Sequence, residues 1–451
     1  MTVDVPNSSR IVGTSEGAAF PAVYSNTEDD VAAIVCGDDY LCSGPESSLT
    51  KLSKKLSEAF EIKTCMIGED DHLSKETKIL NRIIRVTQDG WEIEAGPRHG
   101  ELIIKEPGLE NSKGLTTPGF DEPVNDDDPE LEDWRATKFR SVAARANHLA
   151  LDRPDLQFAV KELCRSMSRP TEGSWRKLTR LGKYIIHRPR LVLHYRWQDP
   201  IAELSTFSDA NWAGCLKSRK STSGGVIKLG DHLLRSWSKT QTNIALSSAE
   251  REFYAATKAA QESLGMATMG RELSMNLKSM IFVDASAALG VAQRHGIGKN
   301  RHLQTGALWI QEQELKRVIR MKKVVGSENC SDILTNNVSR EILEKHAAGM
   351  NMEYRGDRAE KAVQLHLIQR KVRQARAEIN ALEASRVRSK QDEPIRSDLI
   401  GEFVDNTDQV LRKSMMKSND VPKMNINQYE KQVCRHEGSM VKWQQGHQHL
   451  H

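Results

Sequence analysis

Residues 207–254 read FSDANWAGCLKSRKSTSGGVIKLGDHLLRSWSKTQTNIALSSAEREFY, and this stretch decides the fold that the sequence predicts. An apolar run ends at Asp209, and a polar, basic loop follows it. Two short strand-like runs then lead into a long helix that carries Glu250 in its first turn. A carboxylate at a strand end and another at the start of a helix packed over that strand are able to share a metal ion, because hard cations take oxygen ligands.

Two further acidic residues occupy element ends downstream. Asp284 follows the strand-like run 280–283, and Asp332 opens a short helix. Four such carboxylates fit a two-metal nuclease, in which one ion activates water and the other stabilises the leaving oxygen, with the ions about 4 Å apart. A structural reading stays open, because Ser247 and Glu250 have the spacing of a capping box and Asp332 is able to cap a helix.

Length and charge constrain the kind of protein and its partners. At 451 residues the chain is long enough for two or three domains, and its net charge is only +4. The charge is uneven, since residues 134–200 carry 15 basic and 5 acidic side chains. A basic central region indicates a polyanionic partner such as nucleic acid, although solvated helix faces would look the same.

Seven scattered cysteines, with no C-x-x-C spacing, indicate neither a disulfide framework nor a zinc site. No apolar run approaches the roughly 20 residues of a membrane span, and the polar N-terminus lacks a signal-peptide core. We therefore expect an intracellular protein, cytoplasmic or nuclear, that is not secreted and does not interact with membranes.

The patterns divide the chain into six regions. We expect a disordered N-terminus over 1–30 and a first ordered region over 31–119, which begins with a hairpin carrying Asp38 and Asp39 at its tip. Turn chemistry alone explains aspartates there. An acidic linker over 120–133 precedes a helical connection over 134–200, in which two helices and one strand are evident.

The expected catalytic region covers 201–340, and a polar tail covers 341–451. A helix is possible over 360–388, where apolar residues keep heptad spacing. Fewer than three full heptads make a marginal coiled coil, so self-association through 365–382 is a weak prediction. The seam consists of Leu365, Ile368, Val372, Ala375, Ile379 and Leu382.

Several separated segments resemble the ribonuclease H domain of copia-type retrotransposon polyproteins. They are 207–215, 219–224, 236–241, 247–250, 283–288, 301–303 and 331–335, in that order. The resemblance implies an α/β fold with a ribonuclease H-like mixed β-sheet flanked by helices. It also implies that Asp209, Glu250, Asp284 and Asp332 are the catalytic, metal-binding carboxylates for two Mg²⁺ ions, with Mn²⁺ as a possible substitute.

Upstream segments are similar to the reverse transcriptase of the same family. Residues 153–160 and 167–171 resemble the connection between polymerase and nuclease, and Gly37, Asp38 and Asp39 resemble the polymerase hairpin. By this resemblance, Asp38 and Asp39 are the remnant of a polymerase metal site. Only 37 residues precede Asp38, so we expect an incomplete palm that does not polymerise DNA by itself.

The basic loop suggests how a substrate is held. Charged and hydroxyl side chains there are suited to phosphate contacts that carry no sequence information, and by resemblance the substrate is an RNA–DNA hybrid. His302 would position substrate or aid product release, or is simply a surface histidine. The predicted phosphate contacts are Lys217, Arg219, Lys220, Ser221, Thr222 and Ser223.

The sequence thus predicts a ribonuclease H that cuts the RNA strand of hybrids and has other polyprotein-derived domains as possible partners. The alternative is a decayed retroelement fragment that binds nucleic acid without cleaving it.

Overall fold

The computed structural model describes residues 15–37, 39–121, 127–211, 213–215, 218–296 and 305–356. The chain divides into two compact units, Met1–Ile368 and Gln369–His451, and every described residue belongs to the first. The predictions for Asp38, Lys217 and His302, and for the helix over 360–388, fall outside the described residues.

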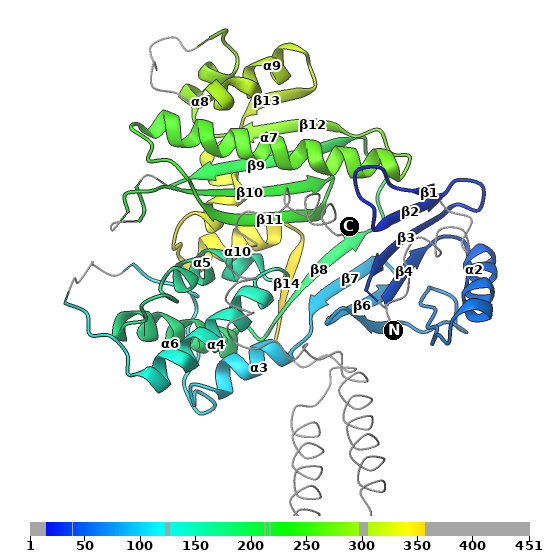
Figure 1. Cartoon of the computed structure of the whole chain (residues 1–451), viewed down its shortest axis with the longest axis horizontal. Helices are drawn as coiled ribbons and strands as arrows, with labels where there is room; N and C mark the ends of the chain where they lie inside the picture. Colours follow the sequence, from blue (N-terminus) through cyan, green and yellow to red (C-terminus); the bar gives the residue numbers. More distant parts are fainter. Residues whose placement is uncertain are drawn as a thin grey trace, which may run out of the picture. The chain divides into compact units, whose positions relative to one another are not determined.

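A five-stranded mixed sheet forms the frame of the expected catalytic region (Figure 1), with the strand order β11-β10-β9-β12-β13. Strand β9 (Glu203–Ala210) pairs antiparallel with β10 (Thr222–Leu229), which pairs antiparallel with β11 (His232–Thr240). On its other side β9 runs parallel to β12 (Lys278–Val283), and β12 runs parallel to β13 (Ile319–Lys323). The mixed sheet flanked by helices that the sequence predicted is therefore confirmed.

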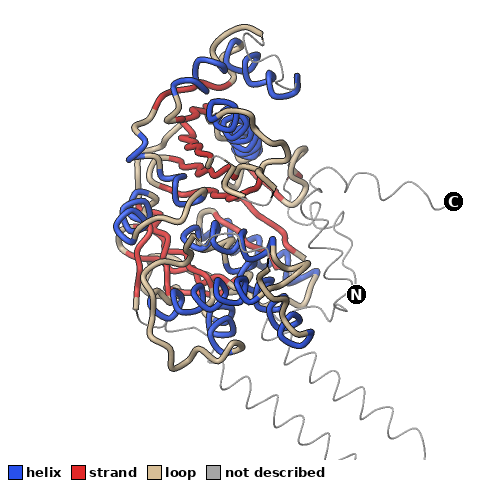
Figure 2. Tube along the Cα trace, turned by 90° about the vertical axis from the view of Figure 1, so that its left-hand side faces the viewer, coloured by secondary structure: helices blue, strands red, loops and turns tan. Residues whose placement is uncertain are grey.

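Helix α7 (Ser248–Glu272) lies across one face of this sheet, as the two views in Figures 1 and 2 show. Phe253, Ala256 and Ala260 on its buried stripe pack against Ile281 of β12. The small alanines allow the helix to approach the sheet closely. Helices α8 (Ser286–Ala292) and α9 (Trp309–Leu315) complete this layer.

The other face of β10 and β11 contacts the short 3-10 helix η4 (Cys330–Leu334) and helix α5 (Gln157–Arg165). The connection region therefore shares a core with this mixed sheet, because Val226 and Leu233 belong to the same buried cluster as residues of α4 (Asp133–Leu149), α5 and α6 (Glu172–His187). Two hydrogen bonds reinforce this contact. Gln157 Nε2 donates to Ser236 Oγ at 3.0 Å, and Lys161 Nζ donates to Thr222 Oγ1 at 2.6 Å.

The connection contains three α-helices where the sequence indicated two. Besides α5 and α6 (Glu172–His187), α4 spans Asp133–Leu149 and begins inside the expected acidic linker. Its buried stripe combines Phe139 and Val142 with alanines such as Ala143 and Ala146. Alanine adds little to an apolar pattern, so periodicity gave no clear signal for this helix.

A second five-stranded sheet, entirely antiparallel, has the order β14-β8-β7-β6-β5. It joins the first ordered region to the connection, because β7 pairs with β8. Helix α3 (Arg98–Lys105) follows β7 in the chain. The strands are β5 (Glu76–Ile79), β6 (Arg82–Thr87), β7 (Gly90–Ala95), β8 (Arg190–Arg196) and β14 (Met352–Arg355).

Strand β14 and helix α10 (Arg340–Gly349) correct the expectation that the fold ends near Arg340. Leu343, Ala347, Met350 and Met352 are buried in the main core cluster. These four side chains stand among charged, polar and small residues, so the segment looked like a polar tail in the sequence. Arg355 of β14 also holds Glu92 of β7 through a pair of hydrogen bonds, which fastens the segment to the sheet.

A small N-terminal sheet has the order β1-β2-β3-β4, with helix α2 (Glu46–Ala59) packed on it through Leu52 and Leu56. Strands β1 (Ser15–Glu16) and β2 (Val23–Asn26) lie where the sequence suggested disorder. Two adjacent apolar residues, Val23 and Tyr24, are buried when β2 pairs with β3 (Val31–Cys36), which forms the predicted hairpin with β4 (Asp39–Ser43). None of the described helices combines the length and the apolar composition that crossing a membrane requires.

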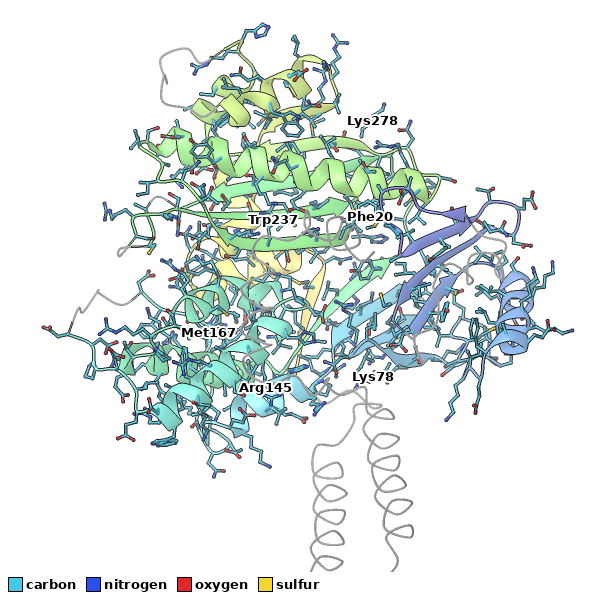
Figure 3. The ribbon with its side chains drawn as sticks, viewed as in Figure 1. Phe20, Lys78, Arg145, Met167, Trp237 and Lys278 are labelled. Carbon is cyan, nitrogen blue, oxygen red and sulfur yellow. The ribbon has the colours of Figure 1, made fainter. Side chains whose placement is uncertain are left out.

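Glycines 224 and 225 let strand β10 be covered closely on both faces. A Cβ atom on Gly224 would lie 2.7 Å from Thr335 Cγ2 and 2.9 Å from the Ser331 carbonyl oxygen. A Cβ atom on Gly225, which points to the opposite face, would meet the ring of Trp237, the β11 residue labelled in Figure 3. Gly224 therefore determines how closely η4 approaches the sheet.

We predict that Gly224→Ala lowers the free energy of unfolding by about 1 to 3 kcal/mol, because the added methyl group overpacks the contact with η4. Gly265→Ala is the matched control, since Gly265 lies within α7 with open space around it and alanine there should stabilise by up to about 1 kcal/mol. Urea unfolding of both variants measures the difference. Equal stabilities would contradict the close packing of η4 on β10.

Candidate metal centre

Parallel pairing of β9 and β12 brings two carboxylates to the same end of the sheet. Val283 lies opposite Ser208 in the register, so the next residues along the two strands are Asp284 and Asp209. Because the two strands run in the same direction, both side chains lie at the same end of the strands. Asp209 is buried, with 8% of its surface exposed, whereas Asp284 is partly exposed.

Helix α7 adds a third carboxylate, that of Glu252. Each of Asp209, Glu252 and Asp284 offers one ligand atom, and these three atoms lie within 4.8 Å of one another. Within the described ranges, this is the one group of three or more acidic, histidine or cysteine side chains that could hold a metal ion. We call it the carboxylate triad.

The structure corrects the sequence-based assignment of Glu250 to this cluster. Glu250 accepts hydrogen bonds from the Leu246 backbone N–H at 2.7 Å and from the Tyr254 hydroxyl at 2.9 Å. Glu250 therefore stabilises the start of α7, which is the structural alternative to metal binding that its spacing from Ser247 allowed. Two positions apart on a helix means about 200° of rotation, so Glu250 and Glu252 cannot face the same strand end.

A signal for Glu252 was present in the sequence. It is followed at helical spacing by Ala256 and Ala259, which are fully buried against the sheet. A carboxylate in line with a buried stripe faces the sheet, whereas a carboxylate at the third residue after a serine N-cap folds back on the cap.

Asp332 lies beside the triad but outside it. Its Oδ1 accepts a hydrogen bond from Asn336 Nδ2 at 2.9 Å. The neighbouring Thr335 hydroxyl donates to Asp209 and also lies 3.0 Å from the Asp332 carbonyl oxygen. Residues after η4 therefore hold Asp209 and Asp332 near each other without making Asp332 a fourth member of the group.

Burial and mutual repulsion make two of the triad carboxylates hard to ionise. Burial raises the pKa of Glu252 to about 8, and the charges of Asp209 and Asp284 act in the same direction. Burial raises the pKa of Asp209 to about 6, with Asp284 and Asp332 adding to the shift while the Thr335 hydrogen bond opposes it. A bound cation would offset this repulsion and favour the ionised form of both carboxylates.

The donor set fits a divalent metal ion. The triad has one oxygen from each of three carboxylates within 4.8 Å of the others, and oxygen ligands are those that Mg²⁺ prefers. Glu252 Oε2 is buried and has no hydrogen-bond partner among the described residues, so one triad oxygen is left for a cation. The Arg251 guanidinium contacts the other oxygen, Oε1, at 2.9 Å.

Only part of the basic loop is placed where the predicted phosphate contacts require it. Ser221, Thr222 and Ser223 are buried, and each hydroxyl oxygen has an internal hydrogen-bond partner. This corrects their assignment as phosphate contacts, because Thr222 and Ser223 belong to β10 and Ser221, directly before it, accepts a hydrogen bond from the Ala213 backbone N–H. Arg219 is exposed and Lys220 is partly exposed, so these two cations stay available to a ligand.

Asp39, the described member of the predicted polymerase pair, begins β4 and pairs with Cys36 across the hairpin. It belongs to no group of three potential ligands within the described ranges.

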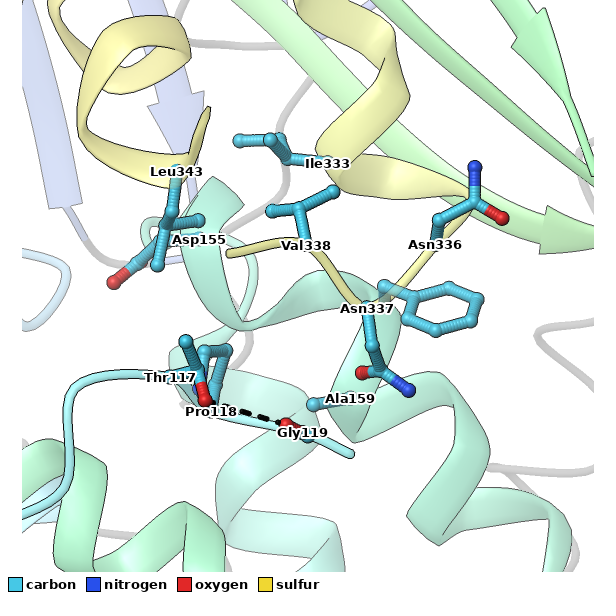
Figure 4. A pocket seen from close by; sticks show the side chains of 11 residues that line it. Thr117, Pro118, Gly119, Asp155, Ala159, Ile333, Asn336, Asn337, Val338 and Leu343 are labelled. Carbon is cyan, nitrogen blue, oxygen red and sulfur yellow. Dashed lines mark hydrogen bonds between the residues drawn. The ribbon is translucent and has the colours of Figure 1, made fainter. Parts of the chain in front are cut away.

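A small pocket has none of the three triad residues in its lining (Figure 4). Its wall joins the segment 117–119 and α5 to the link between η4 and α10. Asn336 lines this pocket and reaches Asp332, so the pocket wall includes one support of the centre.

The fold and the centre together define an α/β domain in which a carboxylate triad lies at one end of a five-stranded mixed sheet flanked by helices. No family model matches the chain. The chain is 26% identical over 321 residues, 68% of its length, to the retrovirus-related Pol polyprotein from transposon RE2 of Arabidopsis thaliana. The chain belongs to the family of copia-type retrotransposon Pol polyproteins.

The chain covers only a small part of the long polyproteins and most of two shorter relatives. The chain spans 21% of the RE2 polyprotein's length. It is 30% identical over 181 residues to the uncharacterized mitochondrial protein AtMg00810 of Arabidopsis thaliana, covering 73% of that protein. It is also 36% identical over 131 residues to the secreted RxLR effector protein 161 of Plasmopara viticola, covering 92% of it.

Two solved structures are similar to parts of the chain. The ribonuclease H1 LC11, isolated from compost, aligns with 32% of this chain and 98% of its own, at 17% identity and a TM-score of 0.24. A foamy viral protease-reverse transcriptase in complex with an RNA/DNA hybrid aligns with 65% of this chain and 35% of its own, at 15% identity and a TM-score of 0.40.

The raised pKa values predict how the metal-free protein responds to pH. The folded-state pKa values of about 6 and about 8 exceed the ordinary values of 3.8 and 4.5. Between about pH 4 and pH 8 the unfolded chain therefore binds fewer protons than the folded chain, and the free energy of unfolding falls as pH rises. Glu252→Gln removes most of this slope and raises the melting temperature at pH 8 in EDTA.

Thermal melts at pH 5 and pH 8, with and without Mg²⁺, measure this effect. Glu250→Gln is the control, since it removes a carboxylate from the same helix turn but should keep the stabilisation by Mg²⁺ at pH 8. If Glu252→Gln responds to pH and Mg²⁺ as the wild type does, the carboxylate triad is misassigned.

Proposed function

We propose that this protein is a divalent-metal-dependent ribonuclease H that hydrolyses the RNA strand of RNA–DNA hybrids. The observation that carries the proposal is the carboxylate triad, in which Asp209, Glu252 and Asp284 meet at the end of the mixed sheet. Membership of the retrotransposon Pol family agrees with it, since such polyproteins process nucleic acid.

In this proposal the triad holds the metal and Asp332 supports it from η4. Two Mg²⁺ ions, or Mn²⁺ in their place, would supply an activated water and stabilise the leaving oxygen when bound. Glu252 and Asp209 lose their protons when they ligate, which makes binding tighter as pH rises through about 6 to 8. Water adds to phosphorus, the bond to the 3′ oxygen breaks, and that oxygen leaves with a proton, giving a 3′-hydroxyl and a 5′-phosphate.

Substrate contacts in the proposal come from cations near the centre. Arg219 is exposed in the loop before β10, where the backbone N–H of Arg219 donates to the Cys215 carbonyl oxygen and closes a tight turn. Such a guanidinium is suited to phosphate contacts that position a duplex. His302 and Lys217 remain proposed contacts from the sequence.

The proposal predicts that Asp209→Asn, Glu252→Gln and Asp284→Asn each lower the rate of hybrid cleavage by at least about 100-fold, because each removes a charge that the metal centre requires. Glu250→Gln should retain most of the activity. The measurement is Mg²⁺-dependent cleavage of a hybrid labelled on the RNA strand. Wild-type rates in the Glu252→Gln protein would contradict the assignment.

A second function is favoured by the basic connection region, with its 15 basic and 5 acidic side chains over residues 134–200. A protein that only binds nucleic acid would need this charge and not the triad. It would show hybrid affinity that falls steeply with salt, and no metal-dependent turnover. The cleavage assay and a salt titration on the same protein therefore separate the two functions.

We also propose that the chain by itself does not polymerise DNA. Asp39 lies apart from any group of three potential metal ligands within the described residues. A primer-extension assay with an RNA template and Mg²⁺ should give no extended product. Extension that disappears in Asp39→Asn would contradict this.

A further inference from the structure

An arginine lies against the carboxylate triad and is part of neither the predicted motif nor the proposed chemistry. Arg251 directly precedes Glu252 in α7, and its Nη1 lies 2.9 Å from Glu252 Oε1. Its positive charge also acts on Asp209, in the direction that favours the ionised carboxylate. The triad therefore contains a cation supplied by the protein.

The backbone of Arg251 is fixed while its side chain is only partly held. Gln241 Nε2 donates to the Arg251 carbonyl oxygen at 2.9 Å, and Gln241 is itself anchored to Ser223 Oγ at the start of β10. In contrast, Arg251 Nε is buried without a hydrogen-bond partner among the described residues, and the side chain is 20% exposed. The guanidinium is thus placed at the centre by one ion pair.

Charge counting shows what this contact does to a metal ion. Three ionised triad carboxylates and one guanidinium give a net charge of −2, against −3 without Arg251. A divalent ion on Glu252 Oε2 and the guanidinium on Oε1 would share the charge of one carboxylate and repel each other. An uncharged side chain in place of Arg251 would leave the whole charge of the triad to the metal.

We propose that Arg251 is a built-in counter-cation of the carboxylate triad that sets how tightly the centre binds divalent metal. It stabilises the buried Glu252 carboxylate in the metal-free protein and weakens metal binding by the same interaction. This inference rests on the proposed function only in taking the triad as a metal site. It does not require that the protein cleaves RNA.

The test is the affinity of the full chain for Mn²⁺ and Mg²⁺, measured by calorimetry at low salt on the wild type and three variants. Arg251→Gln should bind metal at least about tenfold more tightly, because the competing charge is gone. Arg251→Lys, which keeps the charge, should stay within a few-fold of the wild type. Arg235→Gln is the matched control, since Arg235 pairs with Glu262 of the same helix away from the triad.

A second readout covers the metal-free protein. Arg251→Gln should melt at a lower temperature than Arg235→Gln in EDTA and should regain stability when Mn²⁺ is added. Unchanged metal affinity in Arg251→Gln would overturn the inference even if the variant is less stable, because Arg251 would then be a folding contact only. So would equal gains in Arg251→Gln and Arg251→Lys, or no metal binding by any of the proteins.

The outcomes keep this inference distinct from the nuclease proposal. Tighter metal binding by Arg251→Gln without hybrid cleavage by any protein would support the counter-cation and refute the nuclease. Cleavage by the wild type with equal metal affinities in wild type and Arg251→Gln would do the reverse.

Discussion

The parallel pairing of β9 with β12 is the constraint on which the rest of the centre depends. It fixes Asp209 and Asp284 at one end of the sheet, where two negative charges repel each other and one of them is buried. Nothing in the pairing itself offsets this repulsion. The core packing of the strands offsets this repulsion, since Ile281 and Val283 are buried with the apolar residues of α7.

The elements around these strands bring both further charge and partial compensation. Helix α7 adds Glu252 and, one residue earlier, the guanidinium of Arg251. The segment after η4 adds a hydroxyl donor to Asp209 and an amide donor to Asp332. Gly224 permits that segment to lie directly on β10. The connection helices in turn support the sheet, so the centre draws on residues from α5 to α10.

The sequence was sufficient to predict the main sheet and two of the three triad residues, and each element or residue that it missed has a physical reason. The strand-like runs indicated Asp209 and Asp284 as carboxylates at strand ends, and the family resemblance supplied the mixed sheet. Glu250 was assigned to the centre and Glu252 was not considered, because the spacing from Ser247 fits a capping box and a metal ligand equally. The rotation of the helix decides which carboxylate faces the sheet. Helix α4 was missed because its buried stripe is largely alanine. Helix α10 and strand β14 were missed because their few buried apolar residues stand among charged, polar and small residues.

The central claim is that Asp209, Glu252 and Asp284 form a divalent-metal site on this fold. The most direct measurement is a crystal structure of the protein with Mn²⁺, in which the ions are located by their anomalous scattering. The account predicts an anomalous peak bounded by carboxylate oxygens of Asp209, Glu252 and Asp284. Manganese ligated by Glu250, or no peak between these three residues at saturating Mn²⁺, would contradict it.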